Sequence, residues 1–256
     1  DKMLGALAPV TGGILVLSPK SWGRILFGGL NSLMITMGAG EMAGATAKVM
    51  ERLVTSYSKP EYWVQLAGVY AQLEQDEKQL AVLEAAHQQG YIETGSEWRQ
   101  LAQAYYFNEL PYKAAETMQE AMSKGKVDAS VDNLKFVAQA YTQAKENEKA
   151  ISAYMKASEK VEHGNFAAQI AQLYLALDNN EKAVEYAKQA FSKGELDNEG
   201  NLYLAEGMAL LNLKRYEQAI ESFEQAAEIE GAERSAKQWL KYAKSQYKQQ
   251  QQMANL

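Results

Sequence analysis

Apolar residues recur along most of the chain at spacings of three and four, which places their side chains on one face of an α-helix. Within this pattern a short apolar motif ending in tyrosine repeats. LAGVY stands at 66–70, LAQAY at 101–105, VAQAY at 137–141 and IAQLY at 170–174, so successive copies begin 35, 36 and 33 residues apart. A fifth copy begins at Tyr203. A period in this range predicts an array of similar supersecondary units.

A second signal follows the repeated motif at a fixed distance. Alanines seven residues apart recur in four pairs, at 114 and 121, 150 and 157, 183 and 190, and 219 and 226. Short polar segments, such as 145–148 and 178–181, separate the two signals and are typical of turns. The pattern therefore predicts that each unit consists of two helices joined by a turn, with small residues where the backbones of the two helices approach each other. Because one such pair cannot bury its apolar face alone, we expect the units to stack.

These residues resemble the tetratricopeptide repeat family, whose motif combines an aromatic residue, a Leu-Gly/Ala pair, a tyrosine and, in the second helix, two small residues with an aromatic residue between them. The repeat at 96–126 matches this motif with Trp98, Leu101, Ala102, Tyr105, Ala114 and Ala121. Two positions depart from the motif, Gln79 where Ala is usual and Glu206 where Leu is usual. The resemblance covers about residues 60–230. It implies an all-α fold, an α-solenoid in which helix–turn–helix repeats form a right-handed superhelix.

The resemblance also divides the chain. We expect an array over 48–256, with repeats at about 61–93, 96–126, 131–162, 164–194 and 200–231. Residues 48–57 would be the second helix of a preceding repeat, with Val49, Leu53 and Val54 on its buried face.

Residues 234–252 predict one further helix, which would cap the array. An apolar stripe runs along it, formed by Ala236, Trp239, Leu240, Ala243 and Tyr247. Four lysines, Lys237, Lys241, Lys244 and Lys248, run along the other side. Solvation and favourable charge near a helix C-terminus explain these lysines best, and a patch for a membrane or an acidic partner is the alternative.

Residues 1–47 have a different composition. They hold nine of the 18 glycines and only five charged side chains. Each Gly in a helix interior costs about 1 kcal/mol, so we expect an atypical Gly-rich apolar segment, interpreted as a degenerate repeat or an aberrant sequence. Two alternatives fit less well. The uncharged stretch 3–17 is short for a membrane span, and a signal peptide cleaved at Ala43–Ala45 would have two apolar blocks instead of one. A chain that starts at Asp1 is expected to be a fragment or a processed product.

One motif at the end of this segment points to an alternative function, nucleotide binding. Residues 38–43 fit the dinucleotide-binding pattern G-x-G-x-x-A and follow an apolar run, with Glu61 about twenty residues further on. The pattern holds a pyrophosphate only within a strand–helix–strand unit, and no second strand is predicted. A chance match is therefore favoured over a nucleotide-binding protein or enzyme.

Composition narrows the function further. The chain has no cysteine, which excludes disulfides, cysteine-ligated metals and a thiol nucleophile. Its net charge of -6 argues against a nucleic-acid surface. The two histidines, His87 and His163, have no metal-ligand spacing. The acidic run at 217, 221, 224 and 228 predicts a solvated helix face. We therefore predict a non-enzymatic protein with no cofactor and no metal.

The resemblance implies that the first helices of the repeats line a concave groove, which holds an extended peptide or a partner helix. Carried over by register, the predicted partner-binding residues are Gln65, Arg99, Gln100, Gln103, Tyr106, Phe107, Lys135, Phe136, Gln139, Gln143, Gln169 and Gln172. Some relatives capture a C-terminal carboxylate with Lys and Asn. Here Gln103 and Gln139 replace that Asn, so we expect an extended or helical segment of acidic character instead.

A finer resemblance lies in two phrases, KPEYW at 59–63 and GSEWRQLAQAY at 95–105. They are similar to periplasmic repeat proteins that accompany TonB-type energy-transduction systems in marine gammaproteobacteria. This implies a component of a TonB-type complex as partner and a periplasmic or envelope location, with the cytoplasm as the alternative. Self-association through the repeats remains open.

Overall fold

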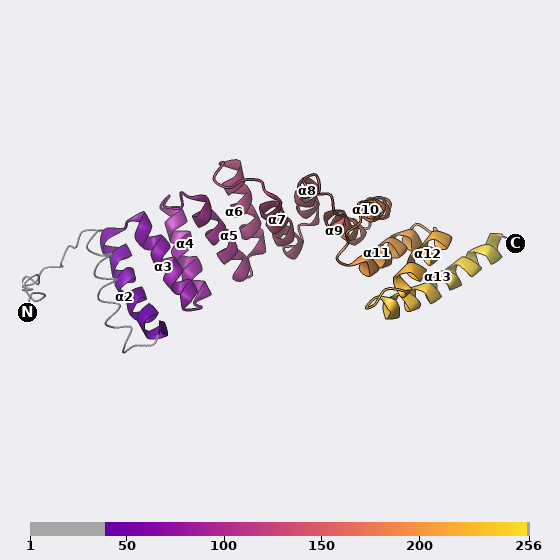
Figure 1. The fold of residues 1–256 in the computed structure, drawn as a ribbon, viewed down its shortest axis with the longest axis horizontal. Helices are drawn as coiled ribbons and strands as arrows, with labels where there is room; N and C mark the ends of the chain where they lie inside the picture. The colour runs from indigo at the N-terminus through magenta and orange to yellow at the C-terminus, as the bar shows by residue number, and fades with distance from the viewer. Residues whose placement is uncertain (1–38, 255–256) are drawn as a thin grey trace, which may run out of the picture. The chain divides into compact units, whose positions relative to one another are not determined.

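The structure is a computed structural model that describes residues 39–254, and helices are the only regular secondary structure in that range (Figure 1). The described residues form two compact units, which meet in the sequence between Tyr91 and Ile92. The first contains α2 (Ala39–Tyr57), α3 (Pro60–Gln72) and α4 (Asp76–Gln88). The second contains α5 (Gly95–Phe107), α6 (Pro111–Ser123), α7 (Val131–Gln143), α8 (Asn147–Ser158), α9 (Asn165–Ala176), α10 (Asn180–Lys193), α11 (Glu199–Asn212), α12 (Tyr216–Ala227) and α13 (Glu233–Ala254). The predicted all-α, solenoid class of fold is confirmed.

In the first unit, α2 packs on α3 and α3 on α4. The expected boundary between residues 47 and 48 falls inside α2, which already begins at Ala39. Glu41 lies in the first turn of α2, where its negative charge favours the helix N-terminus. Val54 is buried as predicted, but Val49 is 44% exposed, so its predicted burial is wrong.

The second unit is built from four antiparallel pairs, α5–α6, α7–α8, α9–α10 and α11–α12. Each pair packs on the next, because α6 contacts α7, α8 contacts α9 and α10 contacts α11. The paired alanines that mark the second helices are all buried. Small residues at these positions allow the helix axes to approach closely. The sequence repeat therefore corresponds to a repeat of packing.

The repeat at α11–α12 departs from the others where its sequence does. Gly207 is required there, because a Cβ atom would lie 2.5 Å from the Phe223 ring. Glu206, in place of Leu, is buried and accepts a hydrogen bond of 2.9 Å from the Ser222 hydroxyl. Burial raises the pKa of the Glu206 carboxyl. The hydrogen bond offsets part of the cost of burying this polar group.

Polar side chains connect the neighbouring repeats at α6–α8. The hydroxyl of the fully buried Tyr141 on α7 lies 2.6 Å from a carboxylate oxygen of Glu116 and 2.7 Å from the amide oxygen of Gln119. The ammonium of Lys149 on α8 donates to the same carboxylate at 3.2 Å and to the hydroxyl of Tyr112 at 2.8 Å. These contacts join α6, α7 and α8 in one polar cluster, which fixes the packing of the two repeats against each other.

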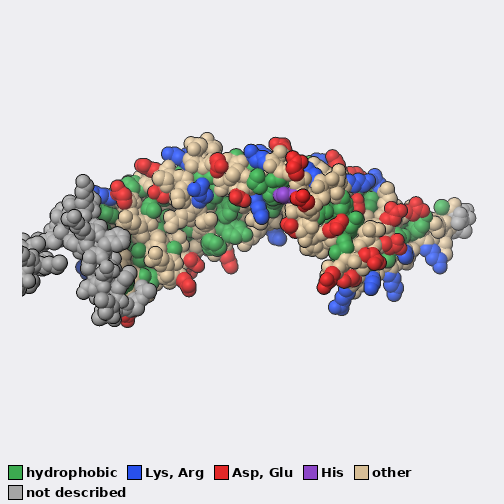
Figure 2. Space-filling view, in the orientation of Figure 1, with side chains coloured by type: hydrophobic (Ala, Val, Ile, Leu, Met, Phe, Trp, Pro, Cys, Tyr) green, Lys and Arg blue, Asp and Glu red, His purple; other side chains and the backbone are tan. Residues whose placement is uncertain are grey.

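The last helix, α13, packs mainly on α12 and buries Ala236 and Ala243. Figure 2 shows its Lys and Arg side chains along one edge. The four residues of the acidic run on α12 are exposed, as predicted, and two of them also contact α13. Glu224 accepts from Lys244 of α13 at 2.8 Å, and Glu217 accepts from the hydroxyl of Tyr247.

Within the described residues, no helix combines the length and the apolar character that a membrane crossing requires. The uncharged stretch 3–17 lies outside those residues.

Candidate functional site

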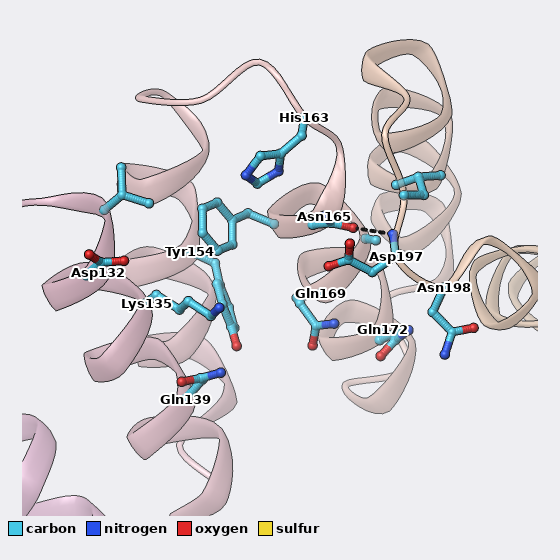
Figure 3. Close-up of a pocket in the computed structure, with 14 residues that line it drawn as sticks. Asp132, Lys135, Gln139, Tyr154, His163, Asn165, Gln169, Gln172, Asp197 and Asn198 are labelled. Carbon is cyan, nitrogen blue, oxygen red and sulfur yellow. Dashed lines mark hydrogen bonds between the residues drawn. The ribbon is translucent and has the colours of Figure 1, made fainter. Parts of the chain in front are cut away.

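A hollow of about 420 Å³ opens between α7 and α9 of the second unit. Figure 3 shows Lys135, Gln139 and Tyr154 on one side of it and Gln169, Gln172 and Asn198 on the other. The first helices of two successive repeats therefore supply opposite walls, and the second helix α8 contributes Tyr154 between them.

Helix periodicity places the polar wall residues. On α7, Lys135 and Gln139 are four residues apart and exposed, whereas Leu134, Val137 and Ala138 turn into the core. The helix begins at a Ser130 cap, whose hydroxyl accepts from the backbone N–H of Asn133 at 3.4 Å. The amphipathic pattern thus fixes which side chains face the hollow.

The far wall is held by backbone contacts between α9 and the segment that precedes α11. The Asn165 side chain accepts a hydrogen bond from the backbone N–H of Asp197 at 2.9 Å, drawn as a dashed line in Figure 3. The N–H of Gly164 donates to the carbonyl of Gly194 at 2.8 Å. A Cβ atom on Gly164 would lie 2.2 Å from the carbonyl oxygen of Ala190. Only glycine permits this approach, so Gly164 determines how closely the start of α9 packs on the end of α10.

Three aromatic side chains, Tyr154, His163 and Phe166, line the hollow. The ring of Phe166 lies 5.8 Å from that of Tyr154 and 5.3 Å from that of His163. Burial raises the pKa of the Tyr154 hydroxyl and outweighs a hydrogen bond with Thr142 that lowers it, so Tyr154 stays a neutral hydrogen-bonding group. The Nδ1 atom of His163 is buried without a hydrogen-bond partner.

A second aromatic cluster lies on α5 and α7. The Tyr106 ring is 5.6 Å from that of Phe136 and 6.2 Å from that of Phe107, which is 71% exposed. These are all residues predicted for the groove. They provide an apolar surface beside polar amides, a combination that suits protein and peptide contacts.

The structure brings some of the predicted residues together and leaves others apart. Lys135, Gln139, Gln169 and Gln172 share the hollow. Arg99, Gln100 and Gln103 lie along α5, Gln143 is the exposed last residue of α7, and Gln65 is an exposed residue of α3 in the first unit. Their role in binding stays a prediction.

Seven polar or aromatic residues of the hollow were missed from sequence: Asp132, Tyr154, His163, Asn165, Phe166, Asp197 and Asn198. Most stand at the starts of helices or just before them, so register along the first helices does not reach them. Tyr154 occupies the aromatic position of the second helix in the repeat motif. That position does not distinguish a residue of the groove from a residue of the core.

The chemistry of the hollow is that of recognition. Amides of Gln139, Gln169 and Gln172 donate and accept hydrogen bonds, as an extended peptide backbone requires. Lys135 supplies a positive charge and Asp132 and Asp197 negative charges. Among residues 39–254, no three His, Cys, Asp or Glu side chains are grouped to hold a metal ion.

The dinucleotide pattern finds no support in the described part of the chain. Residues 39–43 lie within α2, and Gly40 is inside the helix rather than in a loop before it. Glu61 lies in the first turn of α3. The apolar run before Gly38 falls outside the described residues.

A family model described as tetratricopeptide repeat matches residues 166–192 and 200–233. These segments coincide with α9–α10 and with α11–α12 up to the start of α13. The match supports the tetratricopeptide repeat family and agrees in register with the repeats predicted from the sequence. A search of curated proteins gives no match.

Solved structures share the fold. The C-terminal part of a repeat-containing protein of this family from Cytophaga hutchinsonii is 16% identical, with a TM-score of 0.57 over 73% of this chain and 72% of that one. YrrB, described as a tetratricopeptide repeat protein with an unusual peptide-binding site, is 12% identical, with a TM-score of 0.55 over 74% and 96%. MamA is 15% identical, with a TM-score of 0.52 over 64% and 93%. At these identities the likeness concerns the fold.

Proposed function

We propose that this chain is a non-enzymatic scaffold that binds an extended peptide segment of a partner protein in the hollow between α7 and α9. The observation that carries the proposal is that successive repeats line the hollow from opposite sides, one with Lys135 and Gln139 and the next with Gln169 and Gln172. The described residues offer hydrogen-bonding amides and aromatic rings there. The likeness of fold to YrrB, a protein with a peptide-binding site, adds support by analogy.

The lining offers one positive charge, Lys135, and two negative charges, Asp132 and Asp197, so a segment that carries both an acidic and a basic side chain suits it. Lys135 projects from α7 into the hollow (Figure 3). An acidic side chain of the bound segment would pair with it. An apolar side chain of the same segment would lie on Tyr106 and Phe136, on the α5 side of α7. Recognition of backbone by amides and of side chains by separate contacts is the usual division in peptide binding.

Selection from a random peptide library against the full chain tests the proposal. We expect selected peptides to contain acidic residues and to bind Lys135→Glu at least about tenfold more weakly, because like charges then meet. Lys160→Glu is the matched control, since Lys160 is exposed and does not line the hollow. Peptides that bind both variants like the parent chain would refute the site.

We further propose that the partner is a component of a TonB-type complex and that the protein works in the bacterial periplasm or envelope. The support is the resemblance of residues 59–63 and 95–105 to repeat proteins of such systems. Affinity capture from the native source, followed by mass spectrometry, tests this. Enrichment of a TonB-type component that is lost with Lys135→Glu is the expected result, and its absence from the captured proteins would contradict the assignment.

A further inference from the structure

The last helix exposes a surface that the earlier first helices bury. Measured from the small residue of each helix, Trp239 and Tyr242 of α13 correspond to Trp98 and Leu101 of α5. In α5 both are buried, and α5 packs on its second helix α6. In α13, Trp239 is 37% and Tyr242 51% exposed, and no second helix follows within the described residues.

The side chains on this side of α13 form one continuous stripe, which is exposed except at the half-buried Gln246. We call the residues Trp239, Tyr242, Gln246, Gln249 and Met253 the α13 face; Met253 is 65% exposed. Their spacing alternates between three and four residues, which is the spacing of the contact seam between two paired helices. A seam of this length on the surface indicates a partner helix.

The aromatic part of the α13 face is anchored in the fold. The Trp239 ring stacks on that of Phe223 at 6.1 Å and 14°, and its edge meets Tyr242 at 6.2 Å. Beside the two rings, residues Leu211, Asn212 and Tyr216 complete a hollow of about 510 Å³. Rings held in place before binding lose little conformational entropy when a partner covers them.

Charge decides which partner fits. The residues that flank the stripe on its side of the helix are Ser235, Gln238 and Ser245, none of which is charged. The four lysines lie on the other side, where Lys244 pairs with Glu224. A strongly charged partner would therefore find no opposite charge on the α13 face. Two identical faces, by contrast, meet without like-charge repulsion, and glutamine amides can pair with glutamine amides.

We infer that two copies of this chain associate through the α13 face, with α13 of one copy packed on α13 of the other. Trp239 and Tyr242 form the apolar part of the contact, and Gln246 and Gln249 form its hydrogen-bonding part. The contact is isologous, so each copy contributes the same residues. It leaves the hollow between α7 and α9 untouched and is independent of the function proposed there.

Sedimentation velocity of the full chain from about 1 to about 200 μM tests this inference. We expect a reversible monomer–dimer equilibrium that changes little between low and high salt, because no ion pair contributes. Tyr242→Glu and Met253→Glu should each move the midpoint at least about tenfold to higher concentration, since two carboxylates then face each other. Gln251→Glu adds the same charge at an exposed position on the other side of α13 and should leave the midpoint unchanged.

Three results would overturn the inference. They are a monomer at every concentration, a dimer that both face variants leave intact, and a dimer that salt dissociates. Circular dichroism of each variant excludes loss of helix as the cause of a change, and Met253→Glu, near the end of α13, leaves the packed residues Ala236 and Ala243 in place. Peptide binding at Lys135 serves as a separate readout, so failure of one proposal is distinguishable from failure of the other.

Discussion

The hydroxyl of Tyr141 does more for the packing of repeats than its place in the sequence motif indicates. The repeated apolar motif ends in a tyrosine at this position, and its ring is buried. The structure adds the contacts of the hydroxyl with Glu116 and Gln119 of the preceding repeat. The hydrogen bond from Tyr141 is the main cause that lowers the pKa of Glu116, and Lys149 lowers it further.

Tyr141→Phe should lower the free energy of unfolding by about 1 kcal/mol at neutral pH, because the ring remains and only the hydroxyl is lost. The pKa of Glu116 is lowered by folding, so its contribution is present above the pKa of the unfolded chain and is lost as pH falls through the folded pKa. The difference between parent and variant should therefore shrink in acid. Urea unfolding at pH 7 and at about pH 3 measures it, since an ordinary Glu titrates near 4.3. An equal difference at both values would contradict the role of Glu116.

At the scale of the helix, small residues decide how closely two backbones pack. Gly207→Ala on α11 should lower the free energy of unfolding by about 1–3 kcal/mol, because the new methyl group meets the Phe223 ring. Gly68→Ala on α3 is the matched control. Gly68 also lies inside a first helix but has nothing within 4 Å of its Cβ position, so the same change should stabilise its helix by up to about 1 kcal/mol. Thermal unfolding of both variants tests the pair, and a loss of stability at both sites would contradict the packing argument.

For the whole molecule, the sequence was sufficient for the fold class and for the pairs of helices, because each repeat carries its small and aromatic residues at fixed spacing. It was insufficient at both ends. Helix α2 begins nine residues before the predicted boundary, although Gly40 and Gly44 lie within it and glycine is unfavourable in a helix. Glu217 and Glu224 turn toward α13, a contact that no pattern within α12 alone reveals.

The candidate site was predictable only along the first helices. Lys135 and Gln169 follow from register, because both stand on exposed faces of helices whose buried faces are known. Asn165 and Asp197 depend on how the start of α9 meets the segment before α11, which requires the approach at Gly164. Such a contact joins residues more than thirty positions apart and has no local signature in the sequence.

The central claim is that a partner lies in the hollow between α7 and α9, and site-specific photo-crosslinking tests it most directly. A photoreactive amino acid placed at Gln169, on the wall of the hollow, should give an adduct with the captured partner or with a selected peptide. The same amino acid at Glu185, exposed on the second helix α10 and outside the hollow, should give none. Adducts at Glu185 with none at Gln169 would contradict the account.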